Sequence, residues 1–170
     1  YITYMLFVRT NDYDLSIYNF IDKPKSQKIK ITKLAQVAND YPIDVLYFAD
    51  SMGSLSHQRL KDIVNSFQKE WKGELGIHTH DNMGQAVNNS VQAVNYGVSW
   101  IDSTVTGMGR GPGNAQTEYI ILALANHIQN DVNPIKLFEI ISKHFININN
   151  PKQFLSVTYK LEDIIKILDS

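Results

Sequence analysis

Short runs of apolar, β-branched or aromatic residues alternate with helical patterns along most of this 170-residue chain, and this alternation constrains the fold most strongly. Four runs have the character of strands, at 2–8, 45–49, 75–78 and 98–105. Helical spacing follows at least three of them, at about 31–38, 60–71, 86–96 and 115–127. Strands that alternate with helices in this way predict parallel βαβ units, whose loops at the strand ends share one edge. Arg9, which follows the first run, is expected at that edge.

The pattern becomes helical only beyond Asn130. It predicts a helix at 134–145, an Asn- and Pro-rich break at 147–151 and a last helix near 161–168. We therefore predict an α/β unit over residues 1–130 and a helical extension over 131–170. The chain starts inside an apolar run without an initiator Met, and we expect it to be a piece of a larger protein.

Composition excludes several classes of function. The 16 basic and 17 acidic residues nearly balance, which argues against a general nucleic-acid or anionic-membrane surface. The chain has no cysteine, so disulfides and thiolate chemistry are excluded. No apolar run reaches the roughly 18 residues of a membrane span, and no signal peptide is visible. We expect a cytoplasmic protein without nucleic-acid or membrane partners.

The stretch Gly76–Gly84, with the sequence GIHTHDNMG, carries the clearest chemical signal. Side chains alternate along a strand, so His78 and His80 point to the same side. Asp81 to Gly84 then reads as a turn before a helix. Two imidazoles side by side at a strand end can hold one metal ion. The histidines could instead be structural, but the strand end, the turn and the motif described next favour metal binding.

A glycine-rich segment, GMGRGPGN at Gly107–Asn114, follows the fourth run. Its glycines permit positive φ and let backbone amides approach a bound oxygen closely, which would equally suit a phosphate. It matches neither a Walker loop nor the dinucleotide fingerprint. Asn114 could cap the next helix or direct its amide oxygen to a neighbouring metal. Arg110 could neutralise an anionic substrate group or be an ordinary exposed loop arginine.

Together, HTHDNMGQAVNNS from His78, GVSWIDSTVTGMG from Gly97, and Gly113–Asn114 resemble the metal-dependent carbon–carbon lyases and synthases built on TIM barrels. That superfamily includes 3-hydroxy-3-methylglutaryl-CoA lyase, 4-hydroxy-2-oxovalerate aldolase and isopropylmalate synthase. The resemblance is specific from Asp44 to about Leu124. It implies that residues 1–130 form the C-terminal half of a TIM barrel, strands five to eight, and that residues 131–170 add extra helices.

The resemblance also implies a site. His78 and His80 would be metal ligands and Asn114 a further one, with Mg²⁺ or Mn²⁺ preferred and Zn²⁺ possible. In the aldolase branch the residue matching Ser51 holds the substrate carboxylate, although Asp50–Ser51 would equally suit a helix N-cap. Arg110 is a candidate for binding an anionic substrate group. Asp102 could orient a ligand histidine or make a structural hydrogen bond.

The implied reaction is cleavage of a carbon–carbon bond in a 4-hydroxy-2-oxo acid through a metal-stabilised enolate. The Asp-Arg-Glu signature of the superfamily is absent from this sequence. We expect the general base and the enolate-stabilising arginine in a missing N-terminal half, so the fragment alone should be inactive.

Three alternatives remain. The first is an acyl-CoA-dependent Claisen-type synthase of the same superfamily. The second is a non-catalytic half-barrel module, whose exposed strand edges require the missing half-barrel or a homo-oligomer. The third is a phosphate-binding TIM-barrel enzyme that uses the glycine loop. In the leading hypothesis the partner is a small 2-oxo acid substrate.

Overall fold

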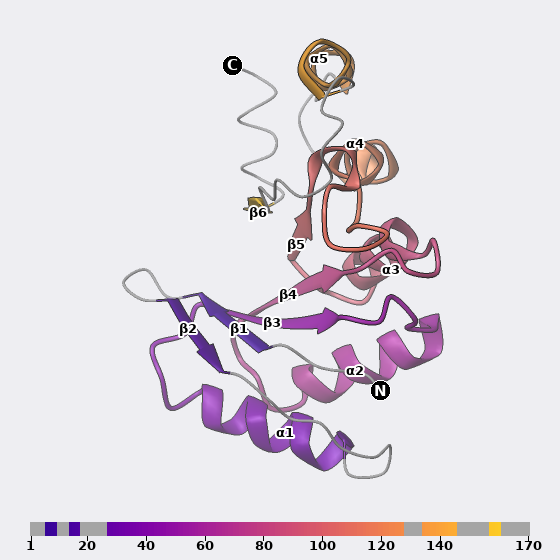
Figure 1. Cartoon of the computed structure of the whole chain (residues 1–170). Helices are drawn as coiled ribbons and strands as arrows, with labels where there is room; N and C mark the ends of the chain where they lie inside the picture. Colours follow the sequence, from indigo (N-terminus) through magenta and orange to yellow (C-terminus); the bar gives the residue numbers. More distant parts are fainter. Residues whose placement is uncertain (1–5, 10–13, 18–26, 128–133, 146–156, 161–170) are drawn as a thin grey trace.

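The computed structural model describes residues 6–9, 14–17, 27–127, 134–145 and 157–160. Within these ranges the strands form one sheet in the order β2-β1-β3-β4-β5-β6 (Figure 1). Their bounds are Leu6–Arg9 for β1, Asp14–Ile17 for β2, Val45–Asp50 for β3, Glu74–Thr79 for β4, Trp100–Ser103 for β5 and Val157–Lys160 for β6.

The three central strands, β3, β4 and β5, are parallel, as the sequence predicts for 45–49, 75–78 and 98–105. Their register places Ala49, His78 and Asp102 side by side in one row across the sheet. Because parallel strands end at the same edge, the loops after Asp50, Thr79 and Ser103 lie together. The predicted parallel α/β arrangement is therefore confirmed for these three strands.

The first predicted strand is present in part, but its direction was predicted wrongly. β1 pairs antiparallel with both β2 and β3 and so lies outside the parallel series. Only four residues separate β1 from β2, and a connection this short reverses the chain, whereas a parallel pair needs a long crossover. Arg9 pairs with Val45 at the start of β3, so it lies at the edge opposite to the expected one.

Beyond Asn130 the prediction of helices alone is also wrong. Helix α5 (Pro134–Ile140) and the π-helical turn after it (Ile141–Phe145) confirm the helix expected at 134–145. Residues 157–160 instead form β6, which pairs antiparallel with β5. The sequence Val-Thr-Tyr-Lys is rich in β-branched and aromatic residues, and β5 offers it an open edge. The helix predicted near 161–168 lies outside the described residues, and the boundary near 130 stays a prediction.

Four helices follow one another along the sheet, α1 (Gln27–Ala38), α2 (His57–Gln68), α3 (Ala86–Asn95) and α4 (Thr117–Ala123). Each contacts the next, so they form one continuous layer (Figure 1). The start of α2 is fixed by Ser56, whose hydroxyl accepts a hydrogen bond from the Arg59 amide at 3.3 Å. None of the helices in the described ranges combines the length and apolar character that a membrane span requires.

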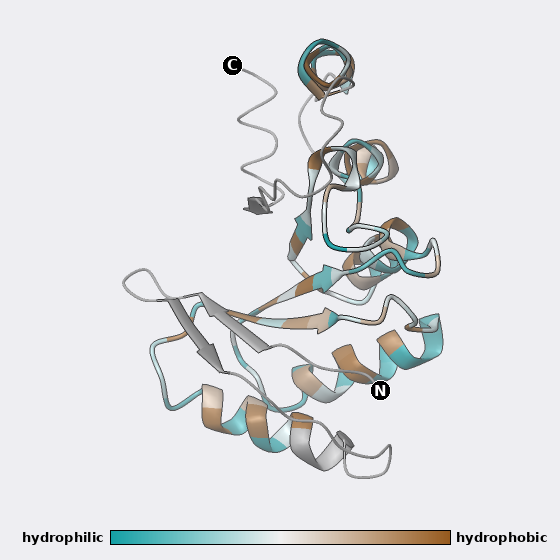
Figure 2. Ribbon diagram, in the orientation of Figure 1, coloured by the Kyte–Doolittle hydropathy of each residue, from teal (hydrophilic) through white to brown (hydrophobic). Residues whose placement is uncertain are grey.

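The hydrophobic core lies between this helix layer and one face of the sheet. Alternate residues of the strands contribute Leu46, Phe48, Leu75, Ile77 and Ile101, all buried in a single cluster with helix side chains. The rings of Phe48 and Phe67 stack with their centroids 5.6 Å apart. In Figure 2, β3 is apolar along most of its length and hydrophilic at its end. Since the apolar residues face the helices, the opposite face of the sheet carries His78 and Asp102.

Candidate metal centre

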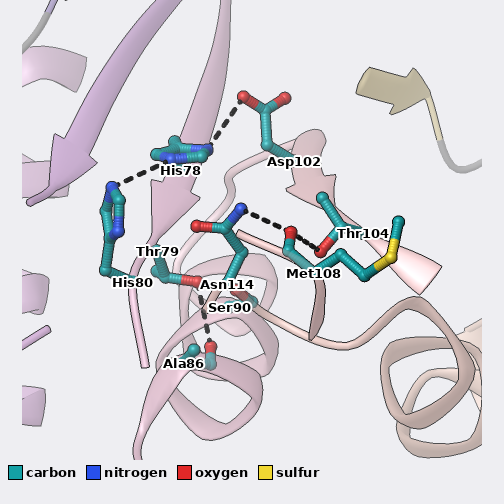
Figure 3. A network of polar contacts seen from close by, with 9 residues as sticks. All are labelled: His78, Thr79, His80, Ala86, Ser90, Asp102, Thr104, Met108 and Asn114. Carbon is teal, nitrogen blue, oxygen red and sulfur yellow. Dashed lines mark hydrogen bonds and ion pairs between the residues drawn. The ribbon is translucent and has the colours of Figure 1, made fainter. Parts of the chain in front are cut away.

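The two histidines of the HTH motif lie together at the end of β4. His78 belongs to the strand and His80 is the first residue after it. Their Nε2 atoms are 3.3 Å apart, and the ring planes cross at 83° with centroids 4.9 Å apart (Figure 3). The alternation of side chains along the strand thus brings both imidazoles to one side, as predicted.

Asp102 supports His78 from the neighbouring strand. Its Oδ2 lies 3.3 Å from Nδ1 of His78, directly across the β4–β5 register. A carboxylate can only accept at this distance, so the proton of a neutral His78 ring belongs on Nδ1. The lone pair of His78 is then on Nε2, the atom that faces His80. The other oxygen of Asp102, Oδ1, is buried and has no hydrogen-bond partner among the described residues.

The electrostatic surroundings favour the neutral form of His80. Burial of its ring is the main cause that lowers the His80 pKa below its usual value of 6.5, and the neighbouring His78 and Arg110 act in the same direction. The carboxylate of Asp50 opposes them. A neutral imidazole keeps a nitrogen lone pair, which is the form that binds a metal ion.

The glycine-rich loop brings Asn114 beside His80. The loop leaves β5 through a short 3-10 turn at Val105–Gly107 and returns so that His80 and Asn114 form an antiparallel bridge. Asp81 donates its backbone N–H to the Gly113 carbonyl at 2.9 Å, and Ala115 donates to Thr79 at 3.2 Å. These bonds fasten the end of the loop to the end of β4 on both sides of Asn114.

The side chain of Asn114 places an unpaired acceptor atom on the side of the two histidines. Its Nδ2 donates to the Met108 carbonyl at 3.2 Å. Its Oδ1 is buried without a hydrogen-bond partner in the described part of the chain, and in Figure 3 it points to the side where the two histidines lie. An unpaired buried acceptor costs about 1–3 kcal/mol, so a binding partner at this point would be stabilising.

The chemistry of these donors fits a divalent cation. The Nε2 atoms of His78 and His80, 3.3 Å apart, would be close enough to bind a single ion, and imidazole nitrogen is a suitable ligand for divalent metals. An amide oxygen is an acceptable third donor for Mg²⁺, Mn²⁺ or Zn²⁺. Among the described residues no group of three or more His, Cys, Asp or Glu side chains could hold a metal, so the third donor offered here is an amide rather than a carboxylate.

Close packing explains two of the loop glycines. A Cβ on Gly113 would lie 2.1 Å from the Gly107 carbonyl oxygen, and Gly113 has a φ of 98°. A Cβ on Gly109 would lie 2.6 Å from Nδ2 of Asn114. The backbone N–H groups of residues 106, 107, 108, 113 and 114 all donate to acceptors within the protein. These five amides are therefore not available to a bound phosphate.

The other predicted residues lie on neighbouring loops. Asp50 is fully buried, and its two carboxylate oxygens accept the backbone N–H groups of Ser54 and Leu55 at 3.1 and 3.0 Å. These bonds fix the turn before α2, and the N-cap of that helix is Ser56 rather than Asp50 or Ser51. Ser51 is half-buried in the turn that follows, and Arg110 is exposed at the tip of the glycine loop. Substrate contacts by Ser51 and Arg110 stay predictions.

The sequence matches the HMGL-like family model over residues 6–144. The chain belongs to the HMGL-like family. A curated relative, the 4-hydroxy-2-oxovalerate aldolase of Geobacillus genomosp. 3, is 33% identical over 96 residues, which are 56% of this chain and 28% of the relative. The 4-hydroxy-2-oxovalerate aldolase 2 of Nocardia farcinica is 32% identical over 115 residues, 66% of this chain and 33% of the relative.

Two solved structures resemble the chain. The N-terminal domain of a candidate aldolase from Bacteroides vulgatus has a TM-score of 0.55 at 27% identity, covering 67% of this chain and 40% of that one. An HMG-CoA lyase from Acinetobacter baumannii, in complex with coenzyme A and 3-methylmalate, has a TM-score of 0.58 at 19% identity. It covers 72% of this chain and 48% of that one, and it supports the fold alone. The chain spans about a third, or less, of the curated relatives named above.

Sequence reasoning missed two parts of this HMGL-like site. The Met108 carbonyl accepts from the Asn114 amide and from the Thr104 hydroxyl. A backbone carbonyl carries no residue signature, so the sequence does not mark it or the hydroxyl that it bonds. The remaining histidines, 57, 127 and 144, are exposed.

Proposed function

We propose that this HMGL-like chain is the metal-binding part of a divalent-metal-dependent aldolase or lyase that cleaves a carbon–carbon bond of a 4-hydroxy-2-oxo acid. The observation that carries the proposal is the 3.3 Å approach of the His78 and His80 Nε2 atoms beside the unpaired buried oxygen of Asn114. The names of the aldolase relatives support the substrate class. We further propose that β3, β4 and β5 belong to the C-terminal half of a TIM barrel.

Each residue of the site has a part in this proposal. His78, His80 and Asn114 would hold the cation, with Mg²⁺ or Mn²⁺ preferred and Zn²⁺ also acceptable. A bound cation supplies Lewis-acid stabilisation of the negative charge that develops on the 2-oxo group. Asp102 keeps the proton of His78 on Nδ1 and fixes the orientation of its ring.

Substrate contacts come from the loops around the histidines. Arg110 is exposed and lies near enough to His80 for its charge to lower that residue's pKa, so it is suited to bind an anionic substrate group. Ser51, in the turn after β3, is the proposed partner of the substrate carboxylate. A general base that takes the proton of the 4-hydroxyl group is not assigned to this chain, and we place it in a further part of the protein.

Metal titration tests the centre directly. Calorimetric titration of the chain with MnCl₂ should show one binding site, and His78→Ala and His80→Ala should each abolish it. His57→Ala is the matched control, because His57 is an exposed histidine on α2 that contacts Asn88 and not the site. Unchanged Mn²⁺ affinity in the variant lacking both His78 and His80 would overturn the proposal.

The reaction is tested on the full-length protein. Breaking the bond between C3 and C4 of an unbranched 4-hydroxy-2-oxo acid gives pyruvate and an aldehyde, so pyruvate release reports the cleavage. It should require added Mg²⁺ or Mn²⁺ and should be lost in His80→Ala. Pyruvate release that persists after chelation would contradict the metal-dependent mechanism.

Partners of the chain are also a proposal. The outer edges of the described sheet belong to β2 and β6, and unpaired strand edges favour association. We propose that either the remaining half-barrel or a second copy of the chain covers them. A well-folded monomer in solution, measured by light scattering on the isolated chain, would contradict this.

A further inference from the structure

The amide group of Asn114 could in principle face either way, because its oxygen and nitrogen have nearly the same shape. The Met108 carbonyl decides the orientation. A carbonyl oxygen is an acceptor only, so the side of the amide that faces it must be the Nδ2 donor, here at 3.2 Å. The Oδ1 atom is thereby turned away from Met108 and toward the side of His78 and His80 (Figure 3).

The Met108 carbonyl is itself held by a second donor. The hydroxyl of Thr104 donates to the same oxygen at 2.7 Å, the shorter of the two bonds. Both lone pairs of the carbonyl are therefore used, one by Thr104 and one by Asn114. The Thr104 hydroxyl thus fixes the peptide group against which the Asn114 amide is aligned.

Thr104 can hold the Met108 carbonyl in place because its own backbone is held by hydrogen bonds. It is 3% exposed, and its N–H donates to the Ala115 carbonyl at 2.9 Å while its carbonyl accepts from Thr117 at 3.0 Å. Its backbone is therefore fastened to the segment just after Asn114, and its side chain to Met108 in the first part of the loop. One residue connects the two ends of the loop that carries the proposed donor.

We propose that Thr104 is a positioning residue, whose hydroxyl holds the Met108 carbonyl and so keeps the Asn114 amide oxygen facing the His78–His80 pair. The role of this oxygen as a metal donor rests on the proposed function. Thr104 does not touch the site itself and acts only through Met108 and Asn114. The prediction is that metal affinity depends on a hydroxyl that is not a ligand.

Two substitutions separate the hydroxyl from the shape of the side chain. Thr104→Val keeps the volume and removes the donor, and it should weaken Mn²⁺ binding by about tenfold, the low end of the range for residues that orient metal ligands. Thr104→Ser keeps the donor and should restore affinity to within about twofold. The matched control is Thr117→Val, which removes another buried threonine hydroxyl, one that pairs with Ser103 at 2.9 Å and not with the loop. It should leave Mn²⁺ affinity unchanged.

A double-mutant cycle distinguishes positioning from a general loss of structure. Thr104→Val should have no further effect on Mn²⁺ affinity in a chain that already carries Asn114→Ala, since the group that it positions is gone. Two results would overturn the proposal. One is a Thr104→Val variant with wild-type affinity, and the other is an equal loss in the wild-type and Asn114→Ala backgrounds.

A measurement without metal separates this inference from the proposed function. In ¹⁵N-¹H spectra of the metal-free chain, the side-chain amide protons of Asn114 should exchange with solvent faster in Thr104→Val than in wild type or Thr104→Ser. If the wild-type chain binds no Mn²⁺ but this difference is observed, the metal proposal fails and the positioning role stands. If exchange is the same in all three chains, the positioning role is refuted whatever the metal result.

Discussion

Alanine substitution at two glycines of the same loop should have very different costs. Gly111 and Gly113 both have positive φ, 64° and 98°, so alanine pays at least about 1–2 kcal/mol at either position, and more at Gly113 because 98° lies outside the left-handed region. Around Gly111 a Cβ meets nothing within 4 Å, whereas at Gly113 it would lie 2.1 Å from the Gly107 carbonyl oxygen. That collision is with backbone, which cannot rotate away, and overpacking of this kind adds about 1–3 kcal/mol.

We therefore expect Gly111→Ala to lower the free energy of unfolding by about 1 kcal/mol and Gly113→Ala by about 3 kcal/mol. Urea unfolding followed by circular dichroism measures both, and equal m-values verify that the unfolding transition is comparable. Gly113→Ala should also weaken Mn²⁺ binding, because it displaces Asn114, while Gly111→Ala should not. Equal destabilisation by the two substitutions would refute the argument that the Gly107 carbonyl leaves no space for a side chain at position 113.

Three further predictions concern the strands. Asp102→Asn should weaken Mn²⁺ affinity by about tenfold with little change in stability, measured by calorimetry and urea unfolding. In the metal-free chain the pKa of His80 is lowered, so the unfolded state binds more protons than the folded state just below about pH 6.5. The free energy of unfolding should therefore fall as the pH decreases through that region. His80→Gln should reduce this pH dependence. Gly76→Ala, whose Cβ would lie 2.3 Å from the Tyr47 ring, should cost about 1–3 kcal/mol in urea unfolding, and Tyr47→Leu should relieve it.

The central part of the fold is readable from sequence because its signals are local. Three apolar runs, each followed by helical spacing, predict β3, β4 and β5 with their helices, and the structure confirms the parallel pairing. The convergence of His78 and His80 follows from the twofold period of a strand and needs no tertiary information. Their proximity to Asp102 follows once the two strands are known to be neighbours.

Other features depend on contacts that a single sequence does not encode in a local pattern. The direction of β1 is set by the short connection to β2, and β6 is defined by its pairing with β5 across more than 50 positions of the chain. Asn114 is directed by a backbone carbonyl, so no residue type marks its partner. In the sequence Asp50–Ser51 fits both a helix N-cap and a substrate contact at Ser51, and no local pattern shows that Asp50 instead accepts the N–H groups of Ser54 and Leu55 in the turn before α2.

The glycine loop is divided between a fixed frame and a variable tip. Gly107, Gly109, Gly113 and Asn114 are buried, and backbone bonds hold Gly107, Gly113 and Asn114, while residues 110–112 between them are exposed. Under the proposed function, substitutions at the tip should alter substrate selectivity without disturbing the Asn114 donor. The tip is therefore the place to begin when redesigning selectivity.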